Sequence, residues 1–198
     1  MYTRLSNTFY LSRDLIYNHV KEGHVVLDCT VGNGNDTILL AELVGNNGKV
    51  YGFDIQLKAI DITRDKLCKS NLDNRVILIN DGHENINLYI EEELDFIIYN
   101  LGYLPKGDKS IKTNSTTTSI SLYKALGLLK TGGMLLITVY IGHEGGLDEK
   151  ESVEEILSAL NQKEFNVLKF EFINQINNPP VLYGVERLNS RRDLGDRC

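Results

Sequence analysis

The sequence predicts a single α/β domain built on a mostly parallel, seven-stranded sheet, and three observations support this prediction. Five short apolar runs alternate with longer amphipathic stretches, which is the pattern of parallel strands joined by helices. Two further runs near the end of the chain are separated only by a turn, which is typical of an antiparallel pair. The length of 198 residues, without an internal repeat or a Pro/Gly/Ser-rich linker, favours one domain over residues 1–198.

Each parallel strand is expected from a short apolar run that ends in a polar or glycine-containing turn. In chain order, these runs are 24–29, 50–54, 76–80, 94–100 and 133–140. The fourth run contains Phe96-Ile97-Ile98-Tyr99, which is apolar on both faces, as expected of a central strand that helices cover on both sides.

Helices are expected where apolar residues recur at helical spacing between the strands. They cover 36–43, 57–69, 115–129 and 149–160. Residues 1–22 are expected to form an N-terminal helical lid, since Leu11 and Leu15 lie on one helix face. The antiparallel pair covers 165–173 and 181–188, and a basic tail over 189–198 ends the chain.

The composition excludes several classes of protein. The net charge is −6, which argues against nucleic-acid binding through a broad basic surface. The three cysteines, Cys29, Cys68 and Cys198, have neither C-x-x-C spacing nor a histidine cluster, so no metal site or disulfide framework is expected. No run approaches the roughly 20 apolar residues of a membrane helix, and the N-terminus does not resemble a signal peptide. We therefore expect a cytoplasmic protein without a membrane partner.

Polar residues follow the first three expected strands, where an open α/β sheet binds its ligands. After the first strand, residues 30–37 form a glycine-containing turn that opens a helix, so backbone N–H groups can approach an anionic group. Asp54 ends the second strand, where a carboxylate can accept both hydroxyls of a ribose. Asp81 follows the third strand and can accept hydrogen bonds from an adenine amino group.

These positions predict an adenosine cofactor, and the first turn narrows the choice. No G-x-x-x-x-G-K-[ST] motif is present, and Thr37 occupies the third glycine position of the dinucleotide motif. Asp28 would repel a pyrophosphate but suits a ligand that carries an ammonium and a sulfonium. S-adenosylmethionine (SAM) is therefore the expected cofactor, with its amino acid end at Asp28 and the turn amides, its ribose at Asp54 and its adenine at Asp81.

Four sequence blocks resemble class I methyltransferases and, more narrowly, a bacterial family named as rRNA methylases. The blocks are 27–37, 50–56, 100–109 and 140–146. Many methyltransferases share the first two, whereas the last two are specific to this family. The resemblance spans nearly the whole chain and implies a Rossmann-like class I methyltransferase fold. It also implies methylation of the aminomethyl group of 5-aminomethyl-(2-thio)uridine at the tRNA wobble position, with the anticodon loop as partner and a homodimer as a conceivable assembly.

The strand ends and the resemblance together give the candidate site. The residues expected to bind the cofactor are Asp28, Thr30, Gly32, Asn33, Gly34, Asp36, Thr37, Asp54, Ile55, Gln56, Asp81, Gly82, His83 and Asn100. The residues expected to bind the substrate are Leu101, Gly102, Tyr103, Lys106, Asp108, Lys109, Tyr140 and His143. Asn100 and Tyr103 are the candidate catalytic residues.

The loop Asn100-Leu101-Gly102-Tyr103 is similar to the Asn-Pro-Pro-Tyr loop of methyltransferases that modify amino groups. In that loop, the Asn oxygen and a following backbone carbonyl accept hydrogens from the target amine. The resemblance implies that Asn100 and the Leu101 carbonyl orient the amine, and that Tyr103 forms a wall of the base pocket. Gly102 replaces a proline and makes the loop more flexible, which leaves the direction of the Leu101 carbonyl open.

Several alternatives stay open at this point. The enzyme could methylate rRNA or a small amine instead of tRNA. A nicotinamide-dependent oxidoreductase is disfavoured by the first turn, and a non-catalytic RNA-binding module is disfavoured by the acidic composition. The proton acceptor could be Asp28, Asp81, His83 or water. The candidate RNA contacts are the lysines of the 105–112 loop together with Arg187, Arg191, Arg192 and Arg197.

Overall fold

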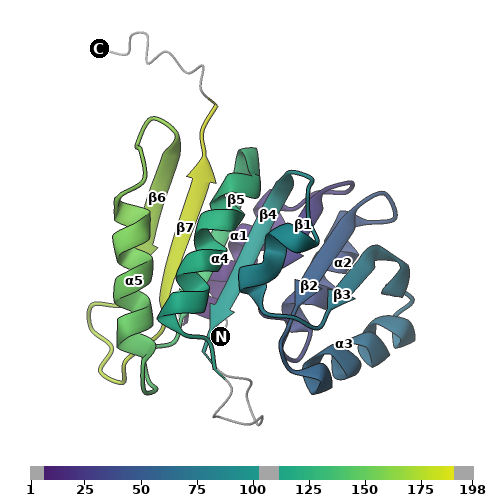
Figure 1. Ribbon diagram of the computed structural model, residues 1–198, viewed down its shortest axis with the longest axis horizontal. Helices are drawn as coiled ribbons and strands as arrows, with labels where there is room; N and C mark the ends of the chain where they lie inside the picture. Colours follow the sequence, from purple (N-terminus) through teal and green to yellow (C-terminus); the bar gives the residue numbers. More distant parts are fainter. Residues whose placement is uncertain (1–6, 103–111, 190–198) are drawn as a thin grey trace.

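A seven-stranded sheet with helices on both faces forms the centre of the computed structural model, which describes residues 7–102 and 112–189 (Figure 1). The strands are β1 (Val25–Asp28), β2 (Lys49–Phe53), β3 (Val76–Ile79), β4 (Leu94–Leu101), β5 (Leu129–Val139), β6 (Phe165–Phe170) and β7 (Val181–Arg187). Their spatial order is β3-β2-β1-β4-β5-β7-β6. The first five strands are parallel, and β7 runs antiparallel to both of its neighbours. The predicted α/β class and mixed sheet are therefore confirmed.

Helices from the two halves of the chain cover opposite faces of the sheet. The helices are α1 (Thr8–His19), α2 (Asn35–Val44), α3 (Leu57–Lys69), α4 (Ser115–Leu128) and α5 (Gly146–Ser158), with short 3-10 helices η1 (Asp73–Arg75) and η2 (His83–Leu88). One core cluster packs α1, α2 and α3 against the sheet, and the other packs α4, α5 and η2 against it. Figure 1 shows α4 and α5 in front of the sheet and α1 behind it.

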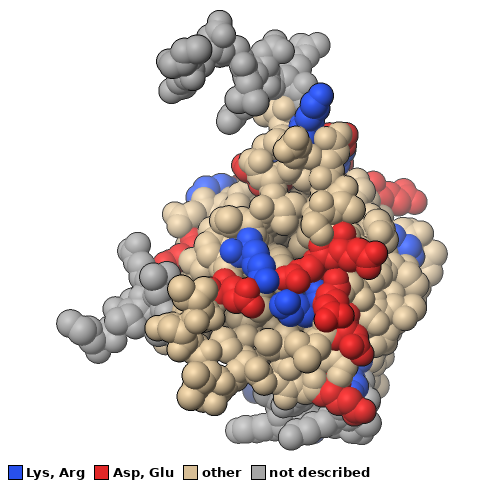
Figure 2. Space-filling view, turned by 90° about the vertical axis from the view of Figure 1, so that its left-hand side faces the viewer, with Lys and Arg blue, Asp and Glu red and all other residues tan. Residues whose placement is uncertain are grey.

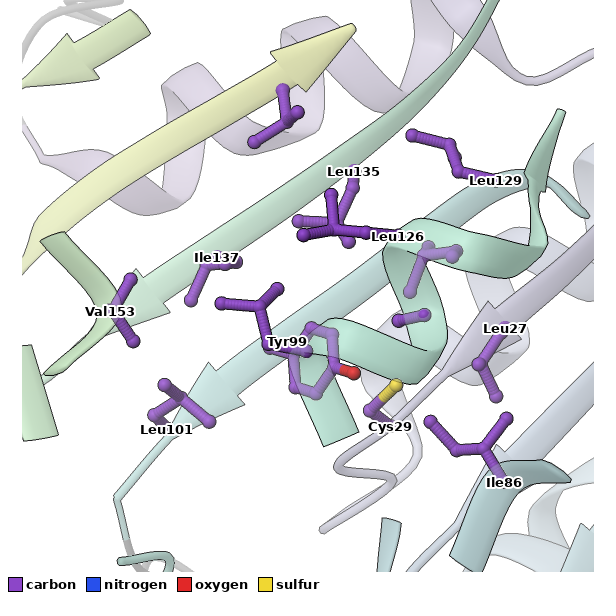
Figure 3. Packing of buried hydrophobic residues seen from close by; sticks show 14 of the residues in the cluster. Leu27, Cys29, Ile86, Tyr99, Leu101, Leu126, Leu129, Leu135, Ile137 and Val153 are labelled. Carbon is purple, nitrogen blue, oxygen red and sulfur yellow. The ribbon is translucent and has the colours of Figure 1, made fainter. Parts of the chain in front are cut away.

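The central strand β4 contributes apolar residues to both core clusters, because its side chains point to both faces of the sheet. Figure 3 shows Tyr99 of β4 beside Ile137 of β5, on the face of the sheet that α4 covers with residues such as Leu126. Tyr99 is 1 % exposed, and its hydroxyl lies 2.7 Å from the hydroxyl of Ser121 in α4. Because both faces of β4 are buried in this way, its carboxyl end is held firmly at the centre of the sheet.

Several predicted boundaries differ from the structure. The strand expected at 133 begins at Leu129, because residues 129–132 continue the chain into β5 directly after α4. The helix expected from residue 149 begins three residues earlier, at Gly146, and the preceding Gly145 has a left-handed backbone conformation. The predicted strand over 165–173 ends at Phe170, since residues 171–178, which are exposed except for the half-buried Phe172, leave the sheet. Neither 3-10 helix was expected, because such short segments have no periodic signal.

The N-terminal helix α1 is a layer of the fold rather than the expected lid over the site. Asn7 caps it by accepting a hydrogen bond from the N–H of Tyr10. Ile16 is fully buried against the sheet, and His19 Nε2 lies 3.1 Å from the carbonyl oxygen of Asp95 at the start of β4. At the edge where the parallel strands end, α1 contributes Phe9 of its first turn and Arg13 of its second turn.

The strand β7 has its first residue at the carboxyl ends of the parallel strands and its last residue at their amino ends. Because β7 is antiparallel to β5, Val181 pairs with Val139 at the carboxyl edge, whereas Arg187 lies at the opposite edge and donates to the carbonyl of Leu129. The structure therefore places Arg187 away from the strand ends, contrary to its expected role beside an RNA site. Arg191, Arg192 and Arg197 lie outside the described residues.

The face formed by α5 and β6 carries acidic and basic side chains together (Figure 2). Glu154 of α5 forms ion pairs with Lys150 at 3.1 Å and with Lys169 of β6 at 2.7 Å. Lys169 forms a second ion pair, with Glu171, at 2.8 Å. These charges neutralise one another, so this edge offers no basic surface to nucleic acid. Among residues 7–102 and 112–189, no helix has the length and apolar character needed to cross a membrane.

Candidate active site

A cavity of about 750 Å³ opens at the carboxyl ends of the parallel strands. The predicted cofactor residues that line it are Thr30, Gly32, Asn33, Asp36, Asp54, Ile55, Gln56, Asp81, Gly82, His83 and Asn100. The predicted substrate residues that line it are Leu101, Gly102, Tyr140 and His143. Its size is typical of a site for a small molecule or cofactor, and all five parallel strands contribute to it.

The turn after β1 shapes one wall of the cavity. The N–H of Gly32 donates to Asp54 Oδ2 at 2.8 Å, which joins the turn to the end of β2. Gly34 has a φ of +77° and begins α2, and a Cβ at this position would lie 2.5 Å from the hydroxyl oxygen of Thr63. Gly34 does not itself line the cavity, so its role is to permit the turn and the close approach of α3.

Asp28 and Thr37 lie beneath the turn and are not among the residues that line the cavity, so their contact with the cofactor stays a prediction. Both are fully buried, and the hydroxyl of Thr37 donates to Asp28 Oδ2 at 2.6 Å while the N–H of Thr30 donates to Oδ1 at 3.1 Å. Burial and the nearby charge of Asp36 raise the pKa of Asp28 to about 7. Asp28 therefore braces the turn, and sequence spacing could not distinguish this role from ligand contact.

Asp54 lies in the cavity at the end of β2. It accepts the N–H of Gly32 through Oδ2 and the N–H of Gln56 through Oδ1, both at 2.8 Å. Each carboxylate oxygen retains capacity for a further hydrogen bond, as a ribose diol requires. Burial raises the pKa of Asp54, whereas these two backbone donors lower it.

Asp81 and His83 follow β3 at the far end of the cavity. The Asp81 carboxylate accepts hydrogen bonds from the side chains of Asn85 and Tyr89 and from the N–H of Gly82, so it also organises η2. These donors lower the pKa of Asp81. Burial lowers the pKa of His83 to about 4, so its ring is neutral at neutral pH, and its buried Nδ1 has no hydrogen-bond partner within the described residues.

Asn100 is anchored at the centre of the site by two hydrogen bonds. Its backbone N–H donates to Thr30 Oγ1 at 2.7 Å, and its side-chain Nδ2 donates to Asp36 Oδ2 at 2.9 Å. Because the amide nitrogen is used as the donor to Asp36, the amide oxygen is available as an acceptor in the cavity. Asp36 lies in the first turn of α2, so this pair joins the ends of β1 and β4.

The backbone after Asn100 differs from the arrangement implied by the Asn-Pro-Pro-Tyr loop. The Leu101 carbonyl accepts the N–H of Tyr140 at 3.2 Å, and the Leu101 side chain is fully buried. One lone pair of this carbonyl is therefore used within the sheet, and its role in orienting an amine stays a prediction. The Gly102 carbonyl accepts the N–H of Thr113 at 2.9 Å, and Gly102 has a φ of +150°.

A buried carboxylate supports this segment from α5. Glu149 is fully buried and accepts the hydroxyl of Thr118 at 2.6 Å and the hydroxyl of Thr113 at 2.9 Å. The same Thr113 oxygen accepts the N–H of Gly102 at 2.8 Å. Sequence reasoning missed Thr113 and Glu149 as part of the site, because no motif marks residues that act through a shared hydrogen bond.

Tyr140 and His143 form the wall on the β5 side of the cavity. A Cβ built on Gly102 would lie 3.6 Å from His143 Nε2 and 3.6 Å from Tyr140 Cβ, so the three residues are neighbours. The Tyr140 side chain is 44 % exposed and available to a ligand. Tyr103, Lys106, Asp108 and Lys109 lie outside the described residues. Sequence reasoning also missed Phe9, Glu84, Asn114 and Asn178, which line the cavity.

The lining of the cavity fits SAM. The carboxylate of Asp54 suits a ribose diol, the backbone of residues 30–33 suits a carboxylate, and the neutral His83 suits an uncharged base. The part of the chain that the structure describes contains no group of three or more His, Cys, Asp or Glu side chains suited to a metal ion.

Comparison with known proteins decides the family. A family model described as "Putative rRNA methylase" matches residues 50–186. The chain belongs to the rRNA methylase family. A second model, Protein-L-isoaspartate(D-aspartate) O-methyltransferase, matches residues 4–89, which contain β1, β2 and β3.

Two solved structures and a curated relative resemble this rRNA methylase family member. A "putative rRNA-methylase" from Clostridium thermocellum is 50% identical with a TM-score of 0.90, over 92% of this chain and 98% of that one. A "putative methyltransferase" from Streptococcus mutans in complex with SAH is 39% identical with a TM-score of 0.84, over 95% and 100%. The chloroplastic tRNA (mnm(5)s(2)U34)-methyltransferase of Arabidopsis thaliana is 37% identical over 180 residues, which are 86% of this chain and 66% of that relative.

These likenesses establish a class I methyltransferase fold and identify SAM as the cofactor. SAH is what remains of SAM after its methyl group has been donated, and the Streptococcus mutans protein holds it on the same fold. The chain spans just under two thirds of the length of the Arabidopsis relative. The predicted family, enzyme class and cofactor are confirmed.

Proposed function

We propose that this protein converts 5-aminomethyl-(2-thio)uridine at the tRNA wobble position to its 5-methylaminomethyl form. The observation that supports this reaction best is Asn100 in the cavity, with its backbone N–H bonded to Thr30 and its side-chain amide bonded to Asp36. An amide oxygen at this point can accept a hydrogen bond from a target amine. The name of the Arabidopsis relative supports the same substrate.

The residues of the chain supply binding, orientation and exclusion of water. When bound, SAM supplies a methyl group attached to a positively charged sulfur. Asn100 orients the lone pair of the amine, and Tyr140 and His143 border the space beside Gly102 for a nucleobase. Positioning a neutral amine in line with the reacting carbon provides most of the rate enhancement in such a reaction.

The proposed partner is the anticodon loop of tRNA, which must approach the carboxyl edge of the sheet to place a base in the cavity. The overall charge of −6 requires local basic groups for this contact. Lys112 lines the cavity, and Arg13 lies with its guanidinium 5.0 Å from the ring centre of Phe9 at the same edge. We propose these two cations as phosphate contacts, and Lys112 would exchange its pairing with Glu144, at 3.6 Å, for a phosphate.

Incubation with defined RNA tests the proposal. tRNA that carries the aminomethyl precursor, SAM and the protein are combined, and the digested nucleosides are analysed by mass spectrometry. We expect the precursor to gain the mass of one methylene and to co-elute with 5-methylaminomethyl-(2-thio)uridine. Unchanged tRNA, with methyl groups appearing instead in an rRNA or small-amine sample, would assign the enzyme to a different substrate.

A further inference from the structure

Asp36 is an acidic side chain of the cavity that is bonded directly to Asn100, the candidate catalytic residue. Its Oδ2 accepts the side-chain Nδ2 of Asn100 at 2.9 Å, and its side chain lines the cavity. Asp28 lies beneath the turn and outside the cavity lining, whereas Asp54 and Asp81 follow β2 and β3. Asp36 is therefore the cavity carboxylate that shares a hydrogen bond with the candidate catalytic residue.

Asp36 lies where the two halves of the site meet, because it follows β1 and accepts a hydrogen bond from Asn100 at the end of β4. Asp81, Asp54 and the first turn follow β3, β2 and β1, which occupy one half of the sheet. Asn100 follows β4 in the centre, and Tyr140 follows β5 in the other half. Asp36 contacts Asn100, and its charge also acts on the Tyr140 phenol, so it faces the half that contains the proposed substrate wall.

The proposed substrate presents a protonation problem. An alkylamine that resembles a lysine side chain has a reference pKa of about 10.4, so at neutral pH it arrives as an ammonium without a lone pair. The amine must lose one proton before it can attack. A carboxylate within reach of the ammonium can both bind the cation and accept that proton.

We propose that Asp36 binds the substrate ammonium beside Asn100 and accepts its proton, an inference that rests on the proposed function. The ammonium N–H bond breaks, and its proton moves to the Asp36 carboxylate. The lone pair left on nitrogen forms the new N–C bond, while the electrons of the broken C–S bond remain on sulfur. The product leaves as a methylated ammonium, and Asp36 then releases its proton to water, so atoms and charge balance.

The surroundings of Asp36 are consistent with this role. Burial raises its pKa, whereas the hydrogen bond from Asn100 and the charge of Arg13 lower it. Among the described residues, the other titratable groups coupled to it are Asp28 at the end of β1 and Tyr140 after β5. A raised carboxyl pKa narrows the gap to the pKa of an amine, which favours proton exchange between the two groups.

A binding experiment tests the inference without methyl transfer. The probes are three anticodon stem-loops that carry uridine, 5-aminomethyluridine or its N-acetylated, uncharged derivative at the wobble position. We expect the protein to bind the aminomethyl probe at least tenfold more tightly than the other two at pH 7. Asp36→Asn should lose this preference while retaining SAM affinity. Asp148→Asn is the matched control, since Asp148 is an exposed acid in the first turn of α5 and should keep the preference.

The pH dependence of methyl transfer provides the second readout. The unmodified protein and Asp148→Asn should show nearly constant single-turnover rates from pH 7 to 9. Asp36→Asn must wait for neutral amine from solution, so its rate should fall about 100-fold at pH 7 and rise about tenfold per pH unit. Asn keeps the size of Asp and an oxygen that can accept from Asn100, so the variant is expected to fold.

Each other outcome overturns a specific statement. An Asp36→Asn variant with an unchanged pH profile and unchanged probe preference would remove Asp36 from proton transfer. Weakened SAM binding combined with a normal profile would assign Asp36 to the cofactor instead. If the unmodified protein neither prefers nor methylates the aminomethyl probe, the proposed function fails and this inference fails with it.

Discussion

The hydroxyl of Thr113 accepts the backbone N–H of Gly102 at 2.8 Å, and the N–H of Thr113 donates to the Gly102 carbonyl at 2.9 Å. Glu149 fixes the hydroxyl by accepting a hydrogen bond from it, so the carboxylate of α5 acts on the backbone next to Asn100. This pairing restrains a glycine with a φ of +150° where related loops use proline. The position of the segment after Asn100 therefore depends on a residue distant in sequence.

Thr113→Val should slow methyl transfer while leaving SAM affinity within about twofold, because it removes the acceptor that holds Gly102 and leaves the cofactor turn intact. Small displacements of reacting groups can cost up to about 100-fold in rate, so a loss of tenfold or more is expected. Thr118→Val is the control, since Thr118 bonds to the other Glu149 oxygen and not to Gly102. Equal rate losses in both variants would mean that the network serves stability alone.

Gly34→Ala should destabilise the protein by about 2 kcal/mol or more and weaken SAM binding, because a Cβ would combine a left-handed backbone with a 2.5 Å approach to Thr63. Gly127→Ala provides the opposite case: a Cβ in α4 meets nothing within 4 Å, so stability should rise by about 0.5–1 kcal/mol. Urea unfolding measures both changes. A neutral Gly34→Ala variant would contradict the tight packing of the turn against α3.

Asp28 predicts a specific pH dependence of stability. Its pKa is raised to about 7 in the folded protein, compared with a reference of 3.8, so the folded state binds more protons between these values. Stability should therefore decrease as pH rises through this window and become constant above about pH 7. Relative to Asp28→Asn, the unmodified protein should lose about 3 kcal/mol between pH 5 and 8 in urea unfolding. Parallel pH curves would show that Asp28 is ionised throughout.

Glu154 predicts the opposite behaviour in acid. Burial alone would raise its pKa, but hydrogen bonds from Lys169, Tyr183 and Lys150 outweigh burial and hold the pKa at about 2, below the reference of 4.5. Its contribution should be complete above about pH 4.5 and disappear as pH falls towards 2. Glu154→Gln should therefore reduce stability at pH 6 more than at pH 3. The same loss at both values would contradict a stabilising ionised Glu154.

The sequence predicted the sheet, the cofactor and most of the cavity lining because these features depend on local patterns. Apolar runs identified β1 to β5, and the polar residues directly after them, such as Asp54 and Asn100, meet at one edge because parallel strands end there. The antiparallel end of the sheet followed from two runs joined by a turn. These inferences required only chain order and side-chain chemistry.

Other features depended on packing between distant segments and could not be read from spacing. Asp28 and Asp36 are both acids near the first turn, yet only Asp36 reaches the cavity, because Thr37 and Thr30 enclose Asp28. The Leu101 carbonyl was expected to face a substrate, but the register of β4 with β5 directs it to Tyr140. The segment that was expected to form a lid is a helix that covers the sheet, and its residue Ile16 is fully buried there.

The rate of a single methyl transfer to aminomethyl tRNA, measured for the unmodified protein and for Asn100→Ala, tests the central claim most directly. Removal of the amide leaves no oxygen to orient the amine, so the rate should fall by about 100-fold or more, while SAM affinity stays within about twofold. Near-normal transfer by Asn100→Ala on this tRNA would contradict the account.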